Sequence, residues 1–171
     1  WKKDIEELKK REKLAEKMGG KEKLKRQKDN NRLNVRERIN LLLDKNSFHE
    51  IGKIAGKAKY DENGELLEFT PSNFIMGRGK INGRNVVIGC DDFTVRGGAA
   101  DAAIHQKQVM SEQFANEYKI PLIRLIEGTG GGGSVKSLDT DSRTYIPGNP
   151  GWNWVVENLS TIPVIASALG P

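Results

Sequence analysis

Residues 120–134 read Ile120-Pro121-Leu122-Ile123-Arg124-Leu125-Ile126-Glu127, followed at once by Gly128-Thr129-Gly130-Gly131-Gly132-Gly133-Ser134. The first part is apolar enough to form a buried β-strand. Glycine has no Cβ, so the backbone of the second part can reach positive φ and turn its N–H groups toward a closely bound group. Such a loop at a strand end suits a phosphate, or an oxygen that becomes negative during a reaction.

The residues upstream predict a β-α-β unit that ends in this strand. Two apolar runs, 74–81 and 85–90, flank Asn82-Gly83, which is a strong hairpin signal. The second strand is expected to resume at 93–95 and to end in Arg96-Gly97-Gly98. A helix is then expected from about Ala99 to Tyr118, before the strand 122–126. The residues expected along one face of that helix are Ala103, Met110, Phe114 and Tyr118.

The remaining segments predict a helical N-terminal part and a second strand-forming part. Charged helices are expected over 2–18 and 35–43, the latter with Asn34 as its N-cap, and a polar hairpin or loop over 52–73. Residues 152–159 predict a helix and residues 163–169 a buried strand. We therefore expect a charged helical segment over 1–46 and an incomplete α/β domain over 47–171.

The net charge of +5 is concentrated at the start of the chain. Residues 1–28 hold 12 Lys or Arg against 6 Asp or Glu, whereas the other 143 residues hold 16 against 17. Acidic residues alternate with the lysines, and no aromatic residue follows Trp1 in this segment, so a solvated helix is favoured over a nucleic-acid-binding arm. A non-enzymatic nucleic-acid-binding module and an assembly module remain the alternatives to an enzyme.

The residue types that bind metals or form disulfides are scarce. A single Cys90 and two distant histidines, His49 and His105, argue against an internal disulfide and against a structural zinc site, so no metal is expected. No stretch approaches the ~20 apolar residues that a transmembrane helix needs, so no membrane association is expected either.

Several interpretations of the glycine-rich loop can be compared. Gly128, Gly130 and Gly133 match a dinucleotide fingerprint, but that motif wants a helix at once and an acidic residue ~20 positions later. A P-loop fails because Val135 stands where the motif requires glycine. A flexible linker is less typical after a buried strand. Backbone N–H groups that stabilise an oxyanion remain, and residues 97–100 form a second candidate of the same kind.

Side chains offer no better catalytic set. No Ser–His–Asp arrangement occurs in a nucleophile-elbow context. Asp91 and Asp92 are adjacent on an expected strand, so their side chains should point to opposite faces and not share a proton.

Three blocks in this order resemble a known family. They are Leu33-Asn34-Val35-Arg36-Glu37-Arg38-Ile39-Asn40-Leu41-Leu42-Leu43-Asp44 with Ser47-Phe48, then Gly77-Arg78-Gly79-Lys80-Ile81-Asn82-Gly83-Arg84, then Asp92-Phe93-Thr94-Val95-Arg96-Gly97-Gly98. With Lys107 in the helix and the glycine loop after the next strand, the chain resembles the carboxyltransferase (beta) subunits of biotin-dependent acyl-CoA carboxylases. The similar group is the propionyl-CoA and methylcrotonyl-CoA carboxylases, over roughly residues 30–171.

The resemblance implies a partial crotonase-like ββα superhelix and a carboxyl transfer from carboxybiotin to the α-carbon of an acyl-CoA. By resemblance, the backbone of Thr129, Gly130 and Gly131 would supply oxyanion donors for the enolate. The acyl-CoA groove would be lined by Arg96, Gly97, Gly98, Ala99 and Gly128. A decarboxylase subunit of the same superfamily is the close alternative.

The same resemblance implies cofactors, partners and location. Biotin would be carried by a partner biotin carboxylase or biotin carrier subunit or domain, and acyl-CoA would be the substrate. A homo-oligomer is expected, located in the cytoplasm or, in a eukaryote, in the mitochondrial matrix. The family's second, biotin-binding domain has no counterpart in this sequence, so residues 1–171 alone are not expected to complete the transfer.

Overall fold

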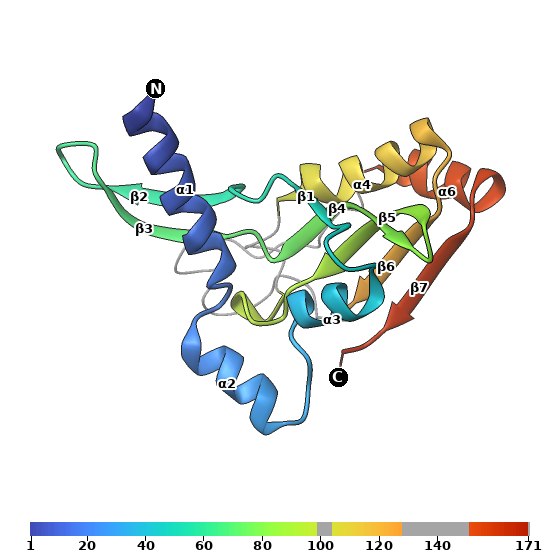
Figure 1. Cartoon of the computed structure of the whole chain (residues 1–171), viewed down its shortest axis with the longest axis horizontal. Helices are drawn as coiled ribbons and strands as arrows, with labels where there is room; N and C mark the ends of the chain where they lie inside the picture. Colours follow the sequence, from blue (N-terminus) through green and yellow to red (C-terminus); the bar gives the residue numbers. More distant parts are fainter. Residues whose placement is uncertain (99–103, 128–150, 171) are drawn as a thin grey trace.

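A mixed sheet with strand order β1-β4-β5-β6-β7 forms the centre of the protein (Figure 1). The computed structural model describes residues 1–98, 104–127 and 151–170. β1 and β4 pair antiparallel, as do β4 and β5, whereas β5, β6 and β7 run parallel. The carboxyl ends of β5 and β6 therefore meet at one edge of the sheet. The bounds of the five strands are β1 (His49–Ile51), β4 (Phe74–Ile81), β5 (Arg84–Asp91), β6 (Leu122–Ile126) and β7 (Val164–Ala168).

The β4–β5 hairpin turns at Asn82-Gly83, as predicted. Both residues have positive φ, 50° and 78°, which the two-residue turn that matches strand twist requires. Their N–H groups donate to the two carboxylate oxygens of Asp44, at 2.9 and 2.8 Å. The hairpin is thus held from outside at the end of β5 opposite to Asp91.

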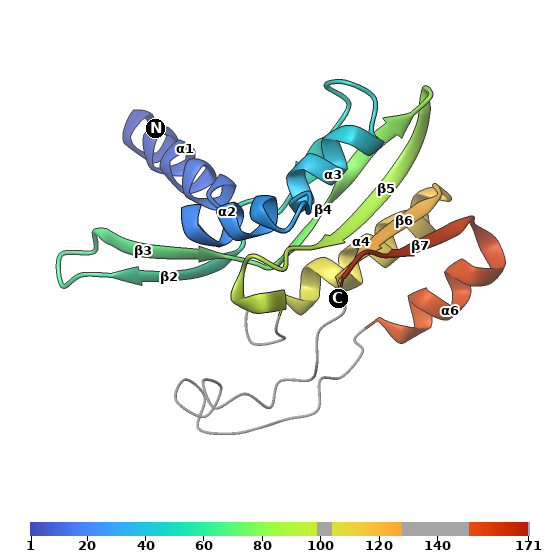
Figure 2. The same ribbon diagram turned by 90° about the horizontal axis from the view of Figure 1, so that it is seen from below.

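Helix α3 (Val35–Leu42) covers one face of the sheet (Figure 2). The predicted N-cap is confirmed, because the Asn34 side chain accepts from the Glu37 N–H and the Glu37 carboxylate accepts from the Asn34 N–H. Apolar side chains of the helix and of alternate sheet positions form the larger core on this face. Its buried members are Val35, Ile39, Leu43, Ile75, Val86, Ile88, Cys90, Ile123 and Leu125.

Helices α4 (His105–Tyr118) and α6 (Trp152–Thr161) cover the opposite face (Figure 2). The apolar cluster here is smaller and consists of Val87, Ala115, Leu122 and Ile162. The two helices are joined by a buried amide pair, in which Asn116 donates to Asn158 at 2.9 Å. The predicted β-α-β unit is confirmed, because β5 and β6 are parallel neighbours connected through α4.

The prediction of a strand at residues 93–95 is wrong. Those residues form a turn, because the Asp92 carboxylate accepts from both the N–H and the hydroxyl of Thr94, at 2.9 and 2.6 Å. Asp92 is buried, so its side chain replaces the sheet ladder as the partner of the Thr94 backbone. β5 accordingly ends at Asp91, and the chain leaves the sheet earlier than the apolar pattern indicated.

The expected helix is present as α4, but the apolar residues at helical spacing do not form its buried face. The helix begins at His105, since Ile104 has extended backbone angles, and residues 99–103 lie outside the described residues. Met110 and Tyr118 are 48% and 63% exposed. The buried positions are instead Lys107, Ser111, Glu112, Ala115 and Asn116. Because polar groups of this face are paired across the interface, the apolar pattern did not reveal it.

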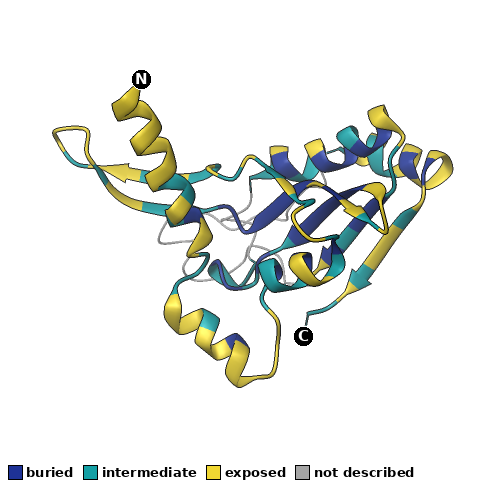
Figure 3. Ribbon diagram, in the orientation of Figure 1, coloured by how far each residue is buried: buried dark blue, intermediate teal, exposed yellow. Residues whose placement is uncertain are grey.

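The expected strand at 163–169 exists as β7, but it is not buried. Ile165 is 57% exposed, because β7 is an edge strand of the described sheet and has one neighbour, β6 (Figure 3). Trp152–Thr161 confirms the helix that was expected just before it.

The first helix lies along a hairpin that projects from the central sheet (Figures 1 and 2). Helix α1 (Lys2–Glu16) lies beside the hairpin of β2 (Gly56–Tyr60) and β3 (Leu66–Pro71), which confirms the polar hairpin expected there (Figures 1 and 2). Arg11 donates to the Tyr60 hydroxyl at 2.6 Å, and Lys53 pairs with Glu16 at 2.6 Å. A further helix, α2 (Lys21–Asp29), was not expected separately.

Candidate functional site

Three of the residues that the sequence singled out lie after the carboxyl end of β5. Arg96, Gly97 and Gly98 form the short 3-10 turn η1 soon after β5, and Glu127 follows β6 directly. The other expected site residues, Ala99, Gly128, Thr129, Gly130 and Gly131, lie outside the described residues. In open α/β sheets, ligands bind beyond the carboxyl ends of parallel strands, so this edge is the natural place for a site.

Turn η1 has an unusual backbone. Arg96, Gly97 and Gly98 have φ angles of 55°, 62° and 71°, three consecutive residues in the left-handed region. A Cβ built on Gly97 would meet no atom of the described residues within 4 Å, apart from its chain neighbours. Its conformation still favours glycine over residues with side chains. A ligand could therefore approach this backbone closely, as the sequence-based hypothesis requires.

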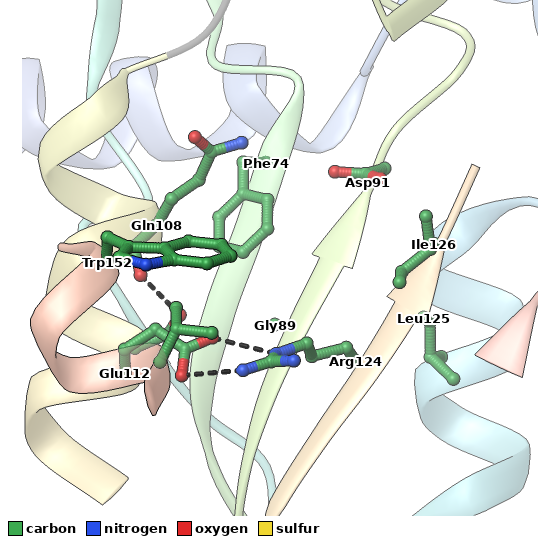
Figure 4. A pocket seen from close by; sticks show the side chains of 11 residues that line it. Phe74, Gly89, Asp91, Gln108, Glu112, Arg124, Leu125, Ile126 and Trp152 are labelled. Atoms are coloured by element: carbon green, nitrogen blue, oxygen red, sulfur yellow. Dashed lines mark hydrogen bonds and ion pairs between the residues drawn. The ribbon is translucent and has the colours of Figure 1, made fainter. Parts of the chain in front are cut away.

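A pocket of about 350 Å³ lies between the sheet and helices α4 and α6 (Figure 4). Phe74 of β4 and Trp152 of α6 supply aromatic walls, and Asp91 stands at the carboxyl end of β5. The other residues that line it come from α4, β6 and α6, namely Gln108, Ser111, Glu112, Arg124, Leu125, Ile126 and Val155. Of these, Leu125 packs its side chain into the core on the α3 face. Gly89 lies at the base of the pocket, where a Cβ would come within 2.8 Å of the Phe74 ring, so its lack of a side chain leaves room for that ring.

An ion pair forms one side of the pocket. Arg124 of β6 donates through Nε and Nη2 to the two carboxylate oxygens of Glu112, each at 2.8 Å (Figure 4). The buried Asn158 amide donates to the same carboxylate and to the Glu112 carbonyl, at 3.0 Å in each case. This fully bonded arrangement explains how α4 buries a carboxylate against the sheet.

The residue at the end of β6 is held from both faces of the sheet. The Glu127 carboxylate is paired with Arg38 of α3, and the Glu127 N–H donates to Oδ2 of Asp91 at 3.1 Å. The Glu127 side chain is 3% exposed and that of Arg38 is 11% exposed. The second carboxylate oxygen of Glu127 is buried and has no hydrogen-bond partner in the described part of the chain.

The carboxyl group of Asp91 has a raised pKa. Burial raises its pKa to about 6, and the charge of Glu127 acts in the same direction, whereas the hydrogen bond from the Glu127 backbone opposes them. Burial also raises the pKa of Asp92, but that carboxylate is bonded to Thr94. The two acids therefore have separate surroundings, which agrees with the expectation that they do not share a proton.

A buried lysine lies on the same helix as the pocket wall. Lys107 of α4 is 6% exposed, and burial lowers its pKa to about 8 despite the nearby Glu50 carboxylate. Glu50 is already held by Arg36 through two hydrogen bonds of 2.8 and 3.1 Å. The Lys107 stem runs close to Gly52 in the segment after β1. It is therefore held near an ion pair on the β1 side of α4 and does not line the pocket.

Other candidate chemistry is absent from the described residues. They contain no group of three or more His, Cys, Asp or Glu side chains that could hold a metal ion, and no helix long and apolar enough to cross a membrane. Cys90 is buried in the larger core, and burial raises the pKa of its thiol. It therefore belongs to the packing and not to the site.

Sequence reasoning missed the side chains that surround this edge. Asp91 was considered only as a partner of Asp92, and Arg38 only as part of a family block. A hint was available for Glu127, because an acidic residue directly after a buried strand must find a partner. No local signal placed Trp152 in the pocket, since its position depends on how α6 crosses the sheet.

Comparisons with known proteins identify the family of the chain. A family model described as the carboxyl transferase domain matches residues 26–145. The chain is 32% identical over 153 residues to the mitochondrial methylcrotonoyl-CoA carboxylase beta chain of Arabidopsis thaliana, covering 89% of this chain and 25% of that protein. It is 35% identical over 114 residues to the mitochondrial propionyl-CoA carboxylase beta chain of Rattus norvegicus, covering 66% and 21%.

A solved structure of transcarboxylase 12S, described as a hexamer with methylmalonyl-coenzyme A and methylmalonic acid bound, has a TM-score of 0.72 at 26% identity. The alignment covers 97% of this chain and 32% of that one. This similarity confirms the expected α/β, crotonase-like fold, here in partial form. The chain thus spans about a fifth to a third of these relatives' lengths. It belongs to the carboxyl transferase domain family.

Proposed function

We propose that this chain is the acyl-CoA-binding part of a biotin-dependent carboxyltransferase. In this proposal it binds the acyl-CoA and stabilises the enolate that forms when the α-carbon is carboxylated. The observation that carries the proposal is the family match across 26–145, which includes both strand ends and the glycine-rich segment between β6 and α6.

The arrangement of the strands supports a role in acyl-CoA binding and enolate stabilisation. Two neighbouring parallel strands end at one edge, and each is followed by small residues whose backbone can approach a ligand. The pocket beside this edge combines aromatic and aliphatic side chains with the paired Glu112 and Arg124, a lining that suits an acyl group with a polar carbonyl. The adenine nucleotide and phosphates of a coenzyme would remain outside it. A catalytic side chain is not required, since backbone donors can supply the electrostatic stabilisation.

The roles of individual residues follow from this proposal. The N–H groups of Thr129, Gly130 and Gly131 would donate to the thioester oxygen as it becomes negative. Arg96, Gly97, Gly98, Ala99 and Gly128 would line the path of the acyl-CoA. Donors of this kind accelerate the reaction only if they bind the enolate more strongly than the starting thioester.

Carboxybiotin would supply the activated carboxyl group from a partner subunit or domain. The pocket does not fit this anionic group, because its charged members are Asp91, Glu112 and Arg124, two acids against one base. Like charges at close range are costly, so we assign no residue of the described chain to biotin. The second binding partner would be a biotin carboxylase or carrier.

The same proposal extends to assembly and location. We infer a homo-oligomer in the cytoplasm or, in a eukaryote, the mitochondrial matrix. Further, we propose residues 1–46 as a helical segment and 47–171 as the acyl-CoA-binding part of the domain. Carboxylation and decarboxylation of an acyl-CoA share the enolate, and the same residues would serve either direction.

Isothermal titration of the complete polypeptide that carries this sequence tests the proposal. Acetyl-CoA, propionyl-CoA, methylcrotonyl-CoA and free CoA are the ligands. We expect saturable binding of at least one thioester, weaker binding of free CoA, and loss of thioester binding in Gly131→Val, whose side chain would crowd the proposed donors.

Circular dichroism and thermal melting establish that Gly131→Val remains folded. Duplex DNA at two salt concentrations is the control for the Lys-rich helices, because electrostatic binding to phosphates falls steeply with salt. Salt-dependent DNA binding without thioester binding would contradict the proposal and favour a nucleic-acid-binding module.

A further inference from the structure

The turn between α1 and α2 contacts the segment that leads from β5 to η1. Gly19 lies in this turn, and its N–H donates to the Thr94 hydroxyl at 3.0 Å. A Cβ built on Gly19 would overlap the Thr94 carbonyl, so the two backbones approach as closely as only glycine allows. The neighbouring Met18 packs against the larger core. The N-terminal helical segment is therefore docked on the chain just before η1.

Thr94 joins this contact to a buried carboxylate. Its hydroxyl accepts the Gly19 N–H and donates to Oδ1 of Asp92 at 2.6 Å. The same oxygen accepts the Thr94 N–H at 2.9 Å. Asp92 and Thr94 are 2% and 3% exposed. Because the hydroxyl is used both as donor and as acceptor, its orientation is fixed, and the three residues form one connected hydrogen-bond network.

The backbone that follows is bonded to the same network. The Val95 N–H donates to the Asp92 carbonyl at 3.2 Å, and the Gly98 N–H donates to the Val95 carbonyl at 3.0 Å. On its other side, the Asp92 N–H donates to the Asn73 carbonyl at 2.7 Å. Hydrogen bonds thus connect the α1–α2 turn with the last residue of η1.

The backbone of η1 needs support of this kind. Arg96, Gly97 and Gly98 all have positive φ, which is unfavourable for Arg96 because its Cβ crowds the following carbonyl. The two glycines constrain the backbone little. Unfavourable backbone conformations persist only where the surrounding structure holds them. Val95 is 2% exposed, whereas the residues of η1 are half-buried, so the buried turn before η1 is the fixed point from which it starts.

We propose that Gly19 and Thr94 are positioning residues, through which the N-terminal helical segment holds η1 in the left-handed conformation that binds the acyl-CoA. The inference rests on the proposed role of residues 96–98 in lining the path of the acyl-CoA. Neither Gly19 nor Thr94 lines the pocket beside α4 and α6, and neither touches the substrate. The helices of residues 1–46 are then part of the acyl-CoA site and not an appended arm.

Gly19→Ala tests the contact itself. Gly19 does not have a left-handed φ, so alanine adds no backbone strain there and acts only by pushing against the Thr94 carbonyl. Gly77→Ala is the matched control. A Cβ on Gly77 would likewise overlap a backbone carbonyl, that of His49, but where β4 pairs with β1. Both variants are expected to lower the melting temperature, because both overpack a buried contact.

Thr94→Val and Thr94→Ser test the hydroxyl. Valine has nearly the same shape but neither accepts the Gly19 N–H nor donates to Asp92, whereas serine keeps both hydrogen bonds. This pair decides the question if Gly19→Ala does not fold. Circular dichroism establishes which variants are folded in the complete polypeptide.

The first readout is the affinity for the thioester that the wild type binds most tightly among acetyl-CoA, propionyl-CoA and methylcrotonyl-CoA. We expect Gly19→Ala and Thr94→Val to weaken binding roughly 10-fold, the scale of one lost hydrogen bond in a site. Thr94→Ser and Gly77→Ala should bind within about threefold of the wild type. A purely structural role would weaken binding in Gly77→Ala as well.

The second readout needs no ligand. Amide hydrogen exchange over residues 92–98 reports how firmly the turn and η1 are held, through the bonded N–H groups of Val95 and Gly98. Exchange should be faster in Gly19→Ala and Thr94→Val than in the wild type, Thr94→Ser or Gly77→Ala.

The outcomes separate the two proposals. A wild-type protein that binds no thioester would overturn the proposed function, and with it the acyl-CoA role of η1. A wild type that binds, with unchanged affinity in Gly19→Ala and Thr94→Val, would overturn only the positioning role. Unchanged exchange over residues 92–98 would overturn it too. So would an equal loss of affinity in Gly77→Ala, because general destabilisation would then account for the effect.

Discussion

The two faces of the central sheet differ in how they are held together. On the α3 face, nine buried apolar residues of the described chain form a continuous core. On the α4/α6 face, four apolar residues are joined by a polar network and a pocket. Polar networks cost more to bury but can hold side chains in one arrangement. The comparison indicates that the first face mainly stabilises the fold and the second mainly shapes a site.

The largest expected effect is a loss of stability when the core on the α3 face is changed. Ile39 of α3 is 1% exposed, so Ile39→Ala should lower the free energy of unfolding by about 2–5 kcal/mol through lost burial and a residual cavity. Chemical denaturation measures this. Leu41→Ala on the same helix is the control, because Leu41 is 74% exposed and should change stability by no more than about 0.5 kcal/mol. Similar losses from both would refute the assignment of the core.

A smaller loss of stability is expected in the polar network of the other face. Asn158 is fully buried and bonded to Asn116 and Glu112. Asn158→Ala should cost roughly 2–3 kcal/mol, since polar partners are left buried and unsatisfied. Denaturation of the double variant Asn116→Ala/Asn158→Ala sharpens the point. If the two residues are coupled, its loss should be less than the sum of the single losses.

The two faces should also differ in their response to pH. The folded pKa of Asp91 is about 6, above its usual value of 3.8, so the folded state binds this proton more tightly than the unfolded state. The resulting stability is full below about pH 4 and is lost as the pH rises through 6, and about two pKa units correspond to at most about 3 kcal/mol. Denaturation of wild type and Asp91→Asn between pH 4 and 7 isolates this contribution. Parallel stability curves would show that Asp91 does not cause it.

The smallest effect on stability should accompany a clear effect on binding. Trp152 and Leu159 both lie on α6 and are 61% and 67% exposed, but only Trp152 lines the pocket. Trp152→Ala should change stability by about 0.5 kcal/mol or less and weaken acyl-CoA binding roughly 2- to 10-fold, as loss of an aromatic contact predicts. Calorimetric titration measures the affinity. If Leu159→Ala weakened acyl-CoA binding as much as Trp152→Ala, the pocket would not be the binding site.

Local patterns in the sequence were sufficient for much of the fold. The Asn82-Gly83 turn, the Asn34 cap and the apolar run at 122–126 each depend on neighbours a few residues away, so their physical causes are visible in the chain. The glycine-rich segment pointed to backbone chemistry at the end of that strand. The family blocks then specified the kind of fold, which the comparisons confirm.

Other features depended on groups far apart in the chain. The α4 face that meets the sheet is polar because Glu112 finds Arg124 and Asn158, partners that no helical periodicity shows. Thr94 forms a turn and not a strand, because its N–H donates to the buried carboxylate of Asp92. The anchoring of Glu127 required α3, β5 and β6 to meet at one point. The sequence by itself determined which segments fold and where small residues follow strands. Only the tertiary structure decided which charges are buried together, because pairing energies depend on distance in space and not along the chain.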